Sequence, residues 1–90
     1  MKFIVKYTIP KPSVVEAEQR FLKTGGAPPA GVKMIGRWHG MSGGGVLIAE
    51  TNDAKALYAW LEKWNDFLHF TTTPCLDDSE AGEVLKAAKR

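Results

Sequence analysis

Arg37 and His39 are the residues of this chain best suited to chemistry, and one residue separates them. Residues two apart in a strand point to the same face, so the two side chains are predicted to converge on one pocket. An arginine fork binds a carboxylate or enolate, while an imidazole moves a proton near neutral pH. We therefore take Arg37 and His39 as candidate catalytic residues. The alternative is an interface pair that bonds to main chain or to a partner subunit.

Aromatic side chains supply possible walls for a ligand pocket. Trp60 and Trp64 stand one helical turn apart, and Trp38 and Tyr7 fall in strand-like segments. Such walls suit a planar organic molecule. With two polar groups added, the candidate ligand-binding residues are Tyr7, Trp38, Trp60, Trp64, Asn65 and His69. The alternative is that the aromatic residues fill the core of a small domain.

Three other kinds of site are disfavoured. His39, Glu50 and His69 offer the ligand types of an iron site, but their spacings of 11 and 19 residues match no local motif, so no metal or cofactor is predicted. The glycine-rich stretch 40–45 precedes a strand rather than a helix, which indicates a hairpin turn and not a phosphate loop. Acidic neighbours disfavour a thiolate at Cys75, so we expect an inert cysteine.

The periodicity of apolar residues predicts the elements that must position these side chains. Strands are predicted over residues 2–9, 32–39, 46–49 and about 67–73, the last closed by Pro74. Helices are predicted after a capping box at 13–16, after the cap residues 51–53 and after the acidic cap 77–80, with Gly25-Gly26 ending the first. In the second strand, simple alternation places Met34 and Trp38 on one face and Arg37 and His39 on the other.

The order strand, helix, strand, strand, helix, strand is typical of the ferredoxin-like plan. The predicted fold class is α+β, with a four-stranded antiparallel sheet and an additional C-terminal helix. Ninety residues at 9.9 kDa make one domain, residues 1–90, with an expected radius of gyration of about 12 Å.

Charge and hydropathy exclude several classes of partner. The net charge is +2, and the basic residues are scattered except for Lys86, Lys89 and Arg90, so no nucleic-acid surface is predicted. No apolar run is long enough to span a bilayer, and Lys6 interrupts the apolar N-terminal stretch, so we expect no membrane association and a cytoplasmic protein. A single cysteine closes no intramolecular disulfide.

Two helices can cover only one face of a four-stranded sheet. The second face must then be polar, or be covered by the C-terminal helix or by another chain. It is predicted to carry Ile4, Ile35 and half of the apolar run 46–49, diluted by lysines and Arg37. Isologous pairing of two such faces is the natural solution, so we predict a homodimer.

Several segments together resemble a known family. They are GRWH at 36–39, GGG at 43–45, ETNDA at 50–54, AWL at 59–61, WN at 64–65 and PCLDD at 74–78. In this combination and order, the chain is similar to the uncharacterised bacterial and phage proteins called domain of unknown function 3303. The resemblance implies a dimeric α+β barrel, in which two ferredoxin-like subunits pack sheet against sheet and each encloses a small cavity. That wider group holds cofactor-free monooxygenases, isomerases, dehydratases and haem-degrading enzymes, so the fold alone assigns no reaction.

Two functions are consistent with these residues and with the resemblance. The first is a homodimer that binds a small organic molecule between sheet and helices, with cofactor-free oxidation or isomerisation as the implied chemistry. The second is a noncatalytic regulatory or protein-interaction dimer, in which the same aromatic residues form the core.

Overall fold

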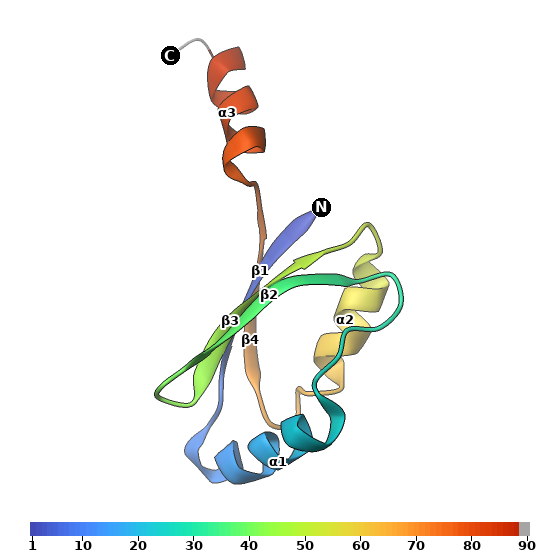
Figure 1. The fold of residues 1–90 in the computed structure, drawn as a ribbon, viewed down its shortest axis with the longest axis vertical. Helices are drawn as coiled ribbons and strands as arrows, with labels where there is room; N and C mark the ends of the chain where they lie inside the picture. The colour runs from blue at the N-terminus through green and yellow to red at the C-terminus, as the bar shows by residue number, and fades with distance from the viewer. Residues whose placement is uncertain (89–90) are drawn as a thin grey trace.

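Four antiparallel strands form one sheet in the order β2-β3-β1-β4, as expected for a ferredoxin-like fold (Figure 1). The computed structural model describes residues 1–88, so Lys89 and Arg90 of the basic cluster lie outside the described residues. The strands are β1 (Lys2–Thr8), β2 (Lys33–Gly40), β3 (Gly44–Glu50) and β4 (His69–Cys75). The helices are α1 (Val14–Thr24), preceded by the short 3-10 turn η1 (Lys11–Ser13), α2 (Ala54–Glu62) and α3 (Asp78–Ala87). Within residues 1–88, the structure has no helix with the length and apolarity that a membrane span needs.

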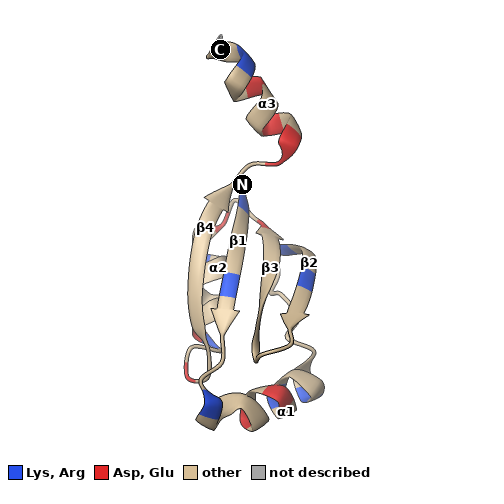
Figure 2. Ribbon diagram, turned by 90° about the vertical axis from the view of Figure 1, so that its left-hand side faces the viewer, with Lys and Arg blue, Asp and Glu red and all other residues tan. Residues whose placement is uncertain are grey.

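Helices α1 and α2 lie on one side of the sheet, which we call the helix face. Val5 and Tyr7 of β1 are buried on this face, and Leu47 of β3 is paired with Val5. The opposite side of the sheet, which we call the open face, carries the alternating residues Ile4 and Lys6 of β1. Figure 2 looks onto the open face, and none of the three helices lies in front of it.

The buried side chains form two clusters rather than one. The first cluster joins β1, β2 and β3 to α2 and includes Val5, Leu47 and Trp60. The second joins β1 to α1 and to the segment before β4, and it consists of Tyr7, Ala17 and Leu68. The helix face is therefore packed at two places, with a space between them.

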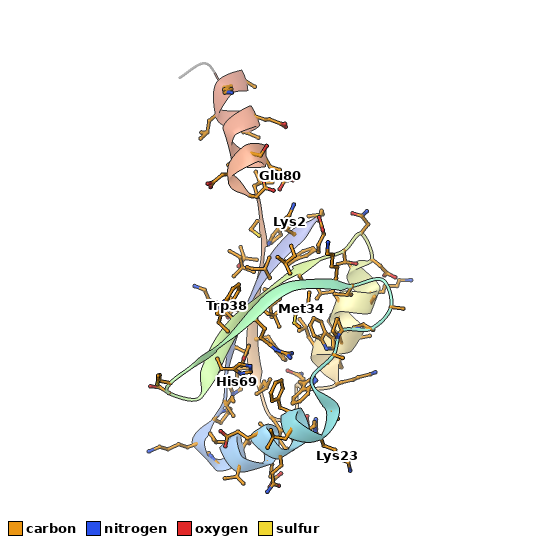
Figure 3. All side chains as sticks on the ribbon, in the orientation of Figure 1. Lys2, Lys23, Met34, Trp38, His69 and Glu80 are labelled. Atoms are coloured by element: carbon orange, nitrogen blue, oxygen red, sulfur yellow. The ribbon has the colours of Figure 1, made fainter. Side chains whose placement is uncertain are left out.

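A β-bulge in β2 changes which side chains face the helices. Met34 pairs with Ala49, but Gly36 rather than Ile35 pairs with the next residue, Ile48, so the bulge inserts one extra residue. The alternation predicted for residues 32–39 is therefore wrong beyond Met34. Arg37 and His39 pair with Leu47 and Gly45 and therefore lie on the same face as Met34. Trp38 lies on the opposite face, and Figure 3 labels Met34 and Trp38.

The helix ends confirm most of the predicted signals. Asp53 caps α2 by accepting a hydrogen bond from the Ala56 amide, and Asp77 forms a reciprocal capping box with Glu80 at the start of α3. Gly25 ends α1 with a φ of 73°, the left-handed conformation that glycine tolerates. The capping box predicted at Ser13 is wrong: Ser13 is held in the 3-10 turn, where its amide bonds to the Pro10 carbonyl, and its side chain makes no cap bond.

Pro74 does not close the fourth strand. It lies inside β4, paired with Phe3. Because β4 is an edge strand with one neighbour, the missing proline N–H costs no ladder bond on its outer side.

Helix α3 projects from the end of the sheet instead of packing on it (Figures 1 and 2). The radius of gyration is 15.1 Å, well above the value of about 12 Å expected for a compact chain of this length. Val84 and Leu85, the large apolar residues of this helix, are 59% and 57% exposed. The C-terminal helix therefore does not cover the open face of its own sheet.

Candidate functional site

A cavity of about 510 Å³ lies on the helix face between the two buried clusters. Its lining draws on both clusters, with Leu47 and Trp60 from one and Tyr7, Ala17 and Leu68 from the other. This volume is within the range of pockets that hold small organic ligands. The lining is mostly apolar, so water gains little by filling it.

The structure brings five of the eight predicted site residues together at this cavity. They are Tyr7, Arg37, His39, Trp60 and Trp64. Tyr7 and Trp60 are buried, whereas His39 is exposed on β2. Glu18 and Leu22 of α1 also line the cavity and are exposed, so the cavity opens between α1 and β2.

The polar end of the cavity is a contact between Tyr7 and His39. Tyr7 pairs with Gly45, and Gly45 pairs with His39, so the three residues form one row across β1, β3 and β2. The tyrosine ring lies over Gly45, where an added Cβ would stand 2.6 Å from Cζ of the ring. Because Gly45 has no side chain, the Tyr7 hydroxyl reaches across a whole strand and comes within 3.2 Å of Nδ1 of His39.

Electrostatics keep the Tyr7 hydroxyl protonated. Burial raises the pKa of Tyr7 above its ordinary value, and the positive charge of Arg37 lowers it by a smaller amount. The phenol is thus neutral at physiological pH. It can donate its proton to an unprotonated Nδ1 of His39, or accept a hydrogen bond from a protonated one.

Arg37 is tied to main chain. Its two terminal nitrogens donate to the carbonyls of Gly26 and Gly25, at 2.8 and 2.9 Å, and its guanidinium lies 4.8 Å from the centre of the Phe21 ring. The contacts fix the C-terminal end of α1 against β2. This is the alternative role foreseen for Arg37, although the side chain still lines the cavity and carries three further N–H groups.

The other three predicted residues lie elsewhere. Trp38 is 60% exposed on the open face, where its ring folds back over Gly36. His69 pairs with Thr8 on the open face and is exposed. Asn65 is exposed in the turn that follows α2. The structure does not place Trp38, Asn65 or His69 in the lining of the cavity.

The three residues weighed for iron do not converge. His39 faces the helices, whereas Glu50 lies on the open face beside Lys2, 3.5 Å from its ammonium. His69 is at the opposite end of that face. In residues 1–88 no three His, Cys, Asp or Glu side chains gather into a metal-binding group.

Arg20 holds the far wall of the cavity in place. It donates to both carboxylate oxygens of Asp66, at 3.0 and 2.8 Å, and to the carbonyl of Lys63 at 2.8 Å. Its guanidinium also lies over the rings of Phe67 and Trp64. A single side chain of α1 thereby fixes the turn that carries Trp64.

Several residues of the lining were not predicted from the sequence. Phe21 is the most informative, because its ring meets His39 edge-on with centroids 5.0 Å apart. Phe70 of β4 and Leu61 of α2 complete the apolar lining. The sequence did contain a signal for Phe21, since it belongs to the apolar stripe of the first helix, but a stripe does not distinguish core from cavity wall.

Comparison with models of known families identifies the family of this chain. The model of a family described as domain of unknown function 3303 matches residues 1–89. The chain belongs to this family. No curated protein matches it. In this member of domain of unknown function 3303, the GRWH segment directly follows the bulge, which is why its arginine and histidine reach the cavity while its tryptophan does not.

Proposed function

We propose that this protein is a homodimer in which each subunit binds a small organic molecule in the cavity between sheet and helices. The observation that carries the proposal is the cavity of about 510 Å³, apolar along its walls and polar at the Tyr7–His39 pair. Ligand pockets combine these two features, because apolar walls supply binding energy and a few polar groups fix orientation.

The lining limits the chemistry that the site can perform. His39 and Glu18 are lining groups that can take a proton, and the Tyr7 phenol can support the imidazole or hydrogen-bond to a substrate oxygen. Proton removal beside a carbonyl, followed by its return at another carbon, is an isomerisation and requires no further reactant. A cofactor-free oxidation would begin with the same proton removal and would need dioxygen as a second substrate.

The test is a thermal melting screen of the purified protein against four probes: indole, 1-naphthol, benzoate and hexanoate. A ligand at a hundredfold excess over its dissociation constant stabilises the folded state by about 2.7 kcal/mol. For a chain of this size, that raises Tm by about 10–20 °C. A screen in which none of the four probes raises Tm, on protein that native mass spectrometry shows to be ligand-free, contradicts the binding proposal.

The chain supplies its own matched controls. Tyr7→Phe and His39→Ala change cavity residues, whereas Tyr58→Phe and His69→Ala change exposed residues of the same types outside it. Tyr7→Phe is expected to weaken binding of a polar probe by about 5- to 10-fold, the value of one hydrogen bond. Equal effects of Tyr7→Phe and Tyr58→Phe would show that the probe binds elsewhere.

A noncatalytic interaction dimer is the second candidate. It is favoured by the contacts of Arg37, which serve to hold α1, and by the exposed apolar surface of α3. A dimer that melts at the same temperature with and without every probe, and that carries no co-purified molecule, would favour this second function.

A further inference from the structure

A single copy of this chain exposes more surface than a compact protein of its mass. Its accessible surface is 6578 Å², whereas a folded chain of 9.9 kDa is expected to expose about 5,200 Å². The excess of about 1,400 Å² is larger than the roughly 800 Å² that each partner contributes to a stable interface. The excess is explained by the projecting α3 and the open face.

Helix α3 carries an apolar stripe that its own sheet does not cover. Ala81, Val84, Leu85 and Ala88 recur at steps of three and four residues and so share one face of the helix. Val84 and Leu85 are more than half exposed, as is Leu76 just before the helix. An isolated helix of this length is marginal in water, so packing of this stripe is what would stabilise it.

Helix α3 projects from the end of its own sheet and does not fold back onto it. Lys2, at the start of β1, lies 3.2 Å from Glu80 and 3.4 Å from Asp77 (Figure 3). These ion pairs join the first turn of α3 to the end of the sheet, and only Leu76 and Asp77 separate α3 from β4. In this position the exposed Val84 and Leu85 do not lie on the open face of their own sheet.

The open face and α3 have complementary charges. Residues 77–83 contain four carboxylates and no basic residue, and Figure 2 shows acidic segments from the base of α3 to about its middle. Lys6 and Lys33 lie on the open face and form no ion pair within residues 1–88, and the same is true of Asp78 and Glu83 on α3. Between these lysines the face is apolar, with Trp38 as its largest exposed side chain.

We propose that α3 is a docking arm: its stripe of Ala81, Val84, Leu85 and Ala88 packs on the open face of a second copy of this chain, and the partner's α3 docks in return. A second copy is the occupant because one chain provides both complementary surfaces, and within one chain they are not in contact. This proposal rests on the homodimer of the proposed function and is independent of the ligand. It differs from the sheet-against-sheet packing that the family resemblance implies, because the partner's α3 and not the partner's sheet covers the open face.

The test measures the mass of full-length variants by light scattering across a range of protein concentrations. Val84→Lys with Leu85→Lys places two cations against a basic face, yet lysine favours helix at exposed positions more than valine does, so the chain still folds. Trp38→Lys alters the other surface. The matched controls are Val15→Lys on α1 and Tyr58→Lys on α2, where the replaced side chains are 63% and 72% exposed.

Wild type and both controls are expected at twice 9.9 kDa. The α3 double variant and Trp38→Lys are expected to dissociate with a dissociation constant raised about 100-fold or more, because each change occurs twice in a symmetric dimer. Far-UV circular dichroism should show that every variant stays folded.

Three results would overturn the proposal. A dimeric α3 double variant would show that α3 is not the arm. A dimeric Trp38→Lys variant beside a monomeric α3 variant would show that α3 docks somewhere other than the open face. A monomeric wild type would remove both the arm and the homodimer, while ligand binding, tested by melting, would still stand or fall separately.

Discussion

Replacing Gly45 with alanine should disrupt the polar end of the cavity and lower stability by a measurable amount. The new Cβ would lie 2.6 Å from Cζ of Tyr7 and would also meet the Tyr7 hydroxyl and the carbonyl oxygen of Trp38. The carbonyl belongs to the neighbouring strand and cannot rotate away, so β2 and β3 must separate. Overpacking of this kind costs about 1–3 kcal/mol.

Two further effects set the net magnitude. Displacing the Tyr7 ring breaks its contact with His39, which is worth about 0.5–1.5 kcal/mol. Alanine also lowers the conformational entropy of the unfolded chain, which stabilises the folded state by about 0.4–1 kcal/mol. The expected net loss for Gly45→Ala is therefore about 0.5–4 kcal/mol, measured by urea unfolding at fixed protein concentration.

Gly82→Ala is the matched control, because nothing lies within 4 Å of a Cβ built at Gly82 in α3. This change should stabilise the protein by about 0.5–1 kcal/mol, since alanine favours helix over glycine. If Gly45→Ala changed the unfolding free energy by less than about 0.5 kcal/mol, the row of Tyr7, Gly45 and His39 would not be packed as described.

Three other outcomes are expected. Arg20 lowers the pKa of Asp66, so their pairing stabilises the fold at neutral pH, and this stabilisation is lost as the pH falls through the acid range below about 4. Arg20→Met should therefore reduce the loss of stability at acid pH in a curve of unfolding free energy against pH. An unchanged loss at acid pH would contradict the stabilising role of the Arg20–Asp66 pair. Burial raises the pKa of Tyr7. In a Tyr58→Phe protein, where Tyr7 is the remaining tyrosine, ultraviolet titration should show ionisation above pH 10, and the unfolding free energy should decline as the pH rises through that range. Ionisation at or below pH 10 would contradict the burial of the Tyr7 hydroxyl. Lys2→Met removes the ion pairs to the first turn of α3, so amide hydrogen exchange should accelerate in α3 and not in α2. If the exchange rates in α3 were the same in wild type and variant, Lys2 would not hold the start of the helix.

Local sequence signals predicted most of the fold. Alternation in β1, the caps at Asp53 and Asp77 and the glycine that ends α1 each act within a few residues, and the structure confirms them. Ser13 shows the limit of such signals. The prolines on either side of Lys11 favoured a 3-10 turn, and this turn took Ser13 out of the extended conformation that an N-cap needs.

The candidate site depended on a feature with only a weak local signal. Gly36 lies beside the bulge, and a glycine inside a strand often marks one, but the strand register is fixed by how β2 pairs with β3. Strict alternation would have put Trp38 with the helices and Arg37 with solvent. The bulge reverses this order, and it therefore determined which of the predicted residues could meet at the cavity.

The position of α3 relative to the sheet had no local signal in the sequence. The sequence shows the apolar stripe of α3, which predicts that one face of the helix is buried. The stripe does not predict which surface buries it. The structure adds a contact that the sequence did not suggest, because Lys2, 78 residues before Glu80, lies 3.2 Å from its carboxylate at the start of the helix.

The three tryptophans allow the most direct test of the cavity as a ligand site. Trp60 and Trp64 line the cavity, while Trp38 lies on the open face, and each indole N–H gives its own signal in a nitrogen-15 correlation spectrum. When a probe that raises Tm is titrated in, the signals of Trp60 and Trp64 should shift together with that of the Tyr7 amide, and the Trp38 signal should stay in place. A saturable shift confined to Trp38, or no shift at Trp60 and Trp64 at saturation, would contradict the proposed ligand site.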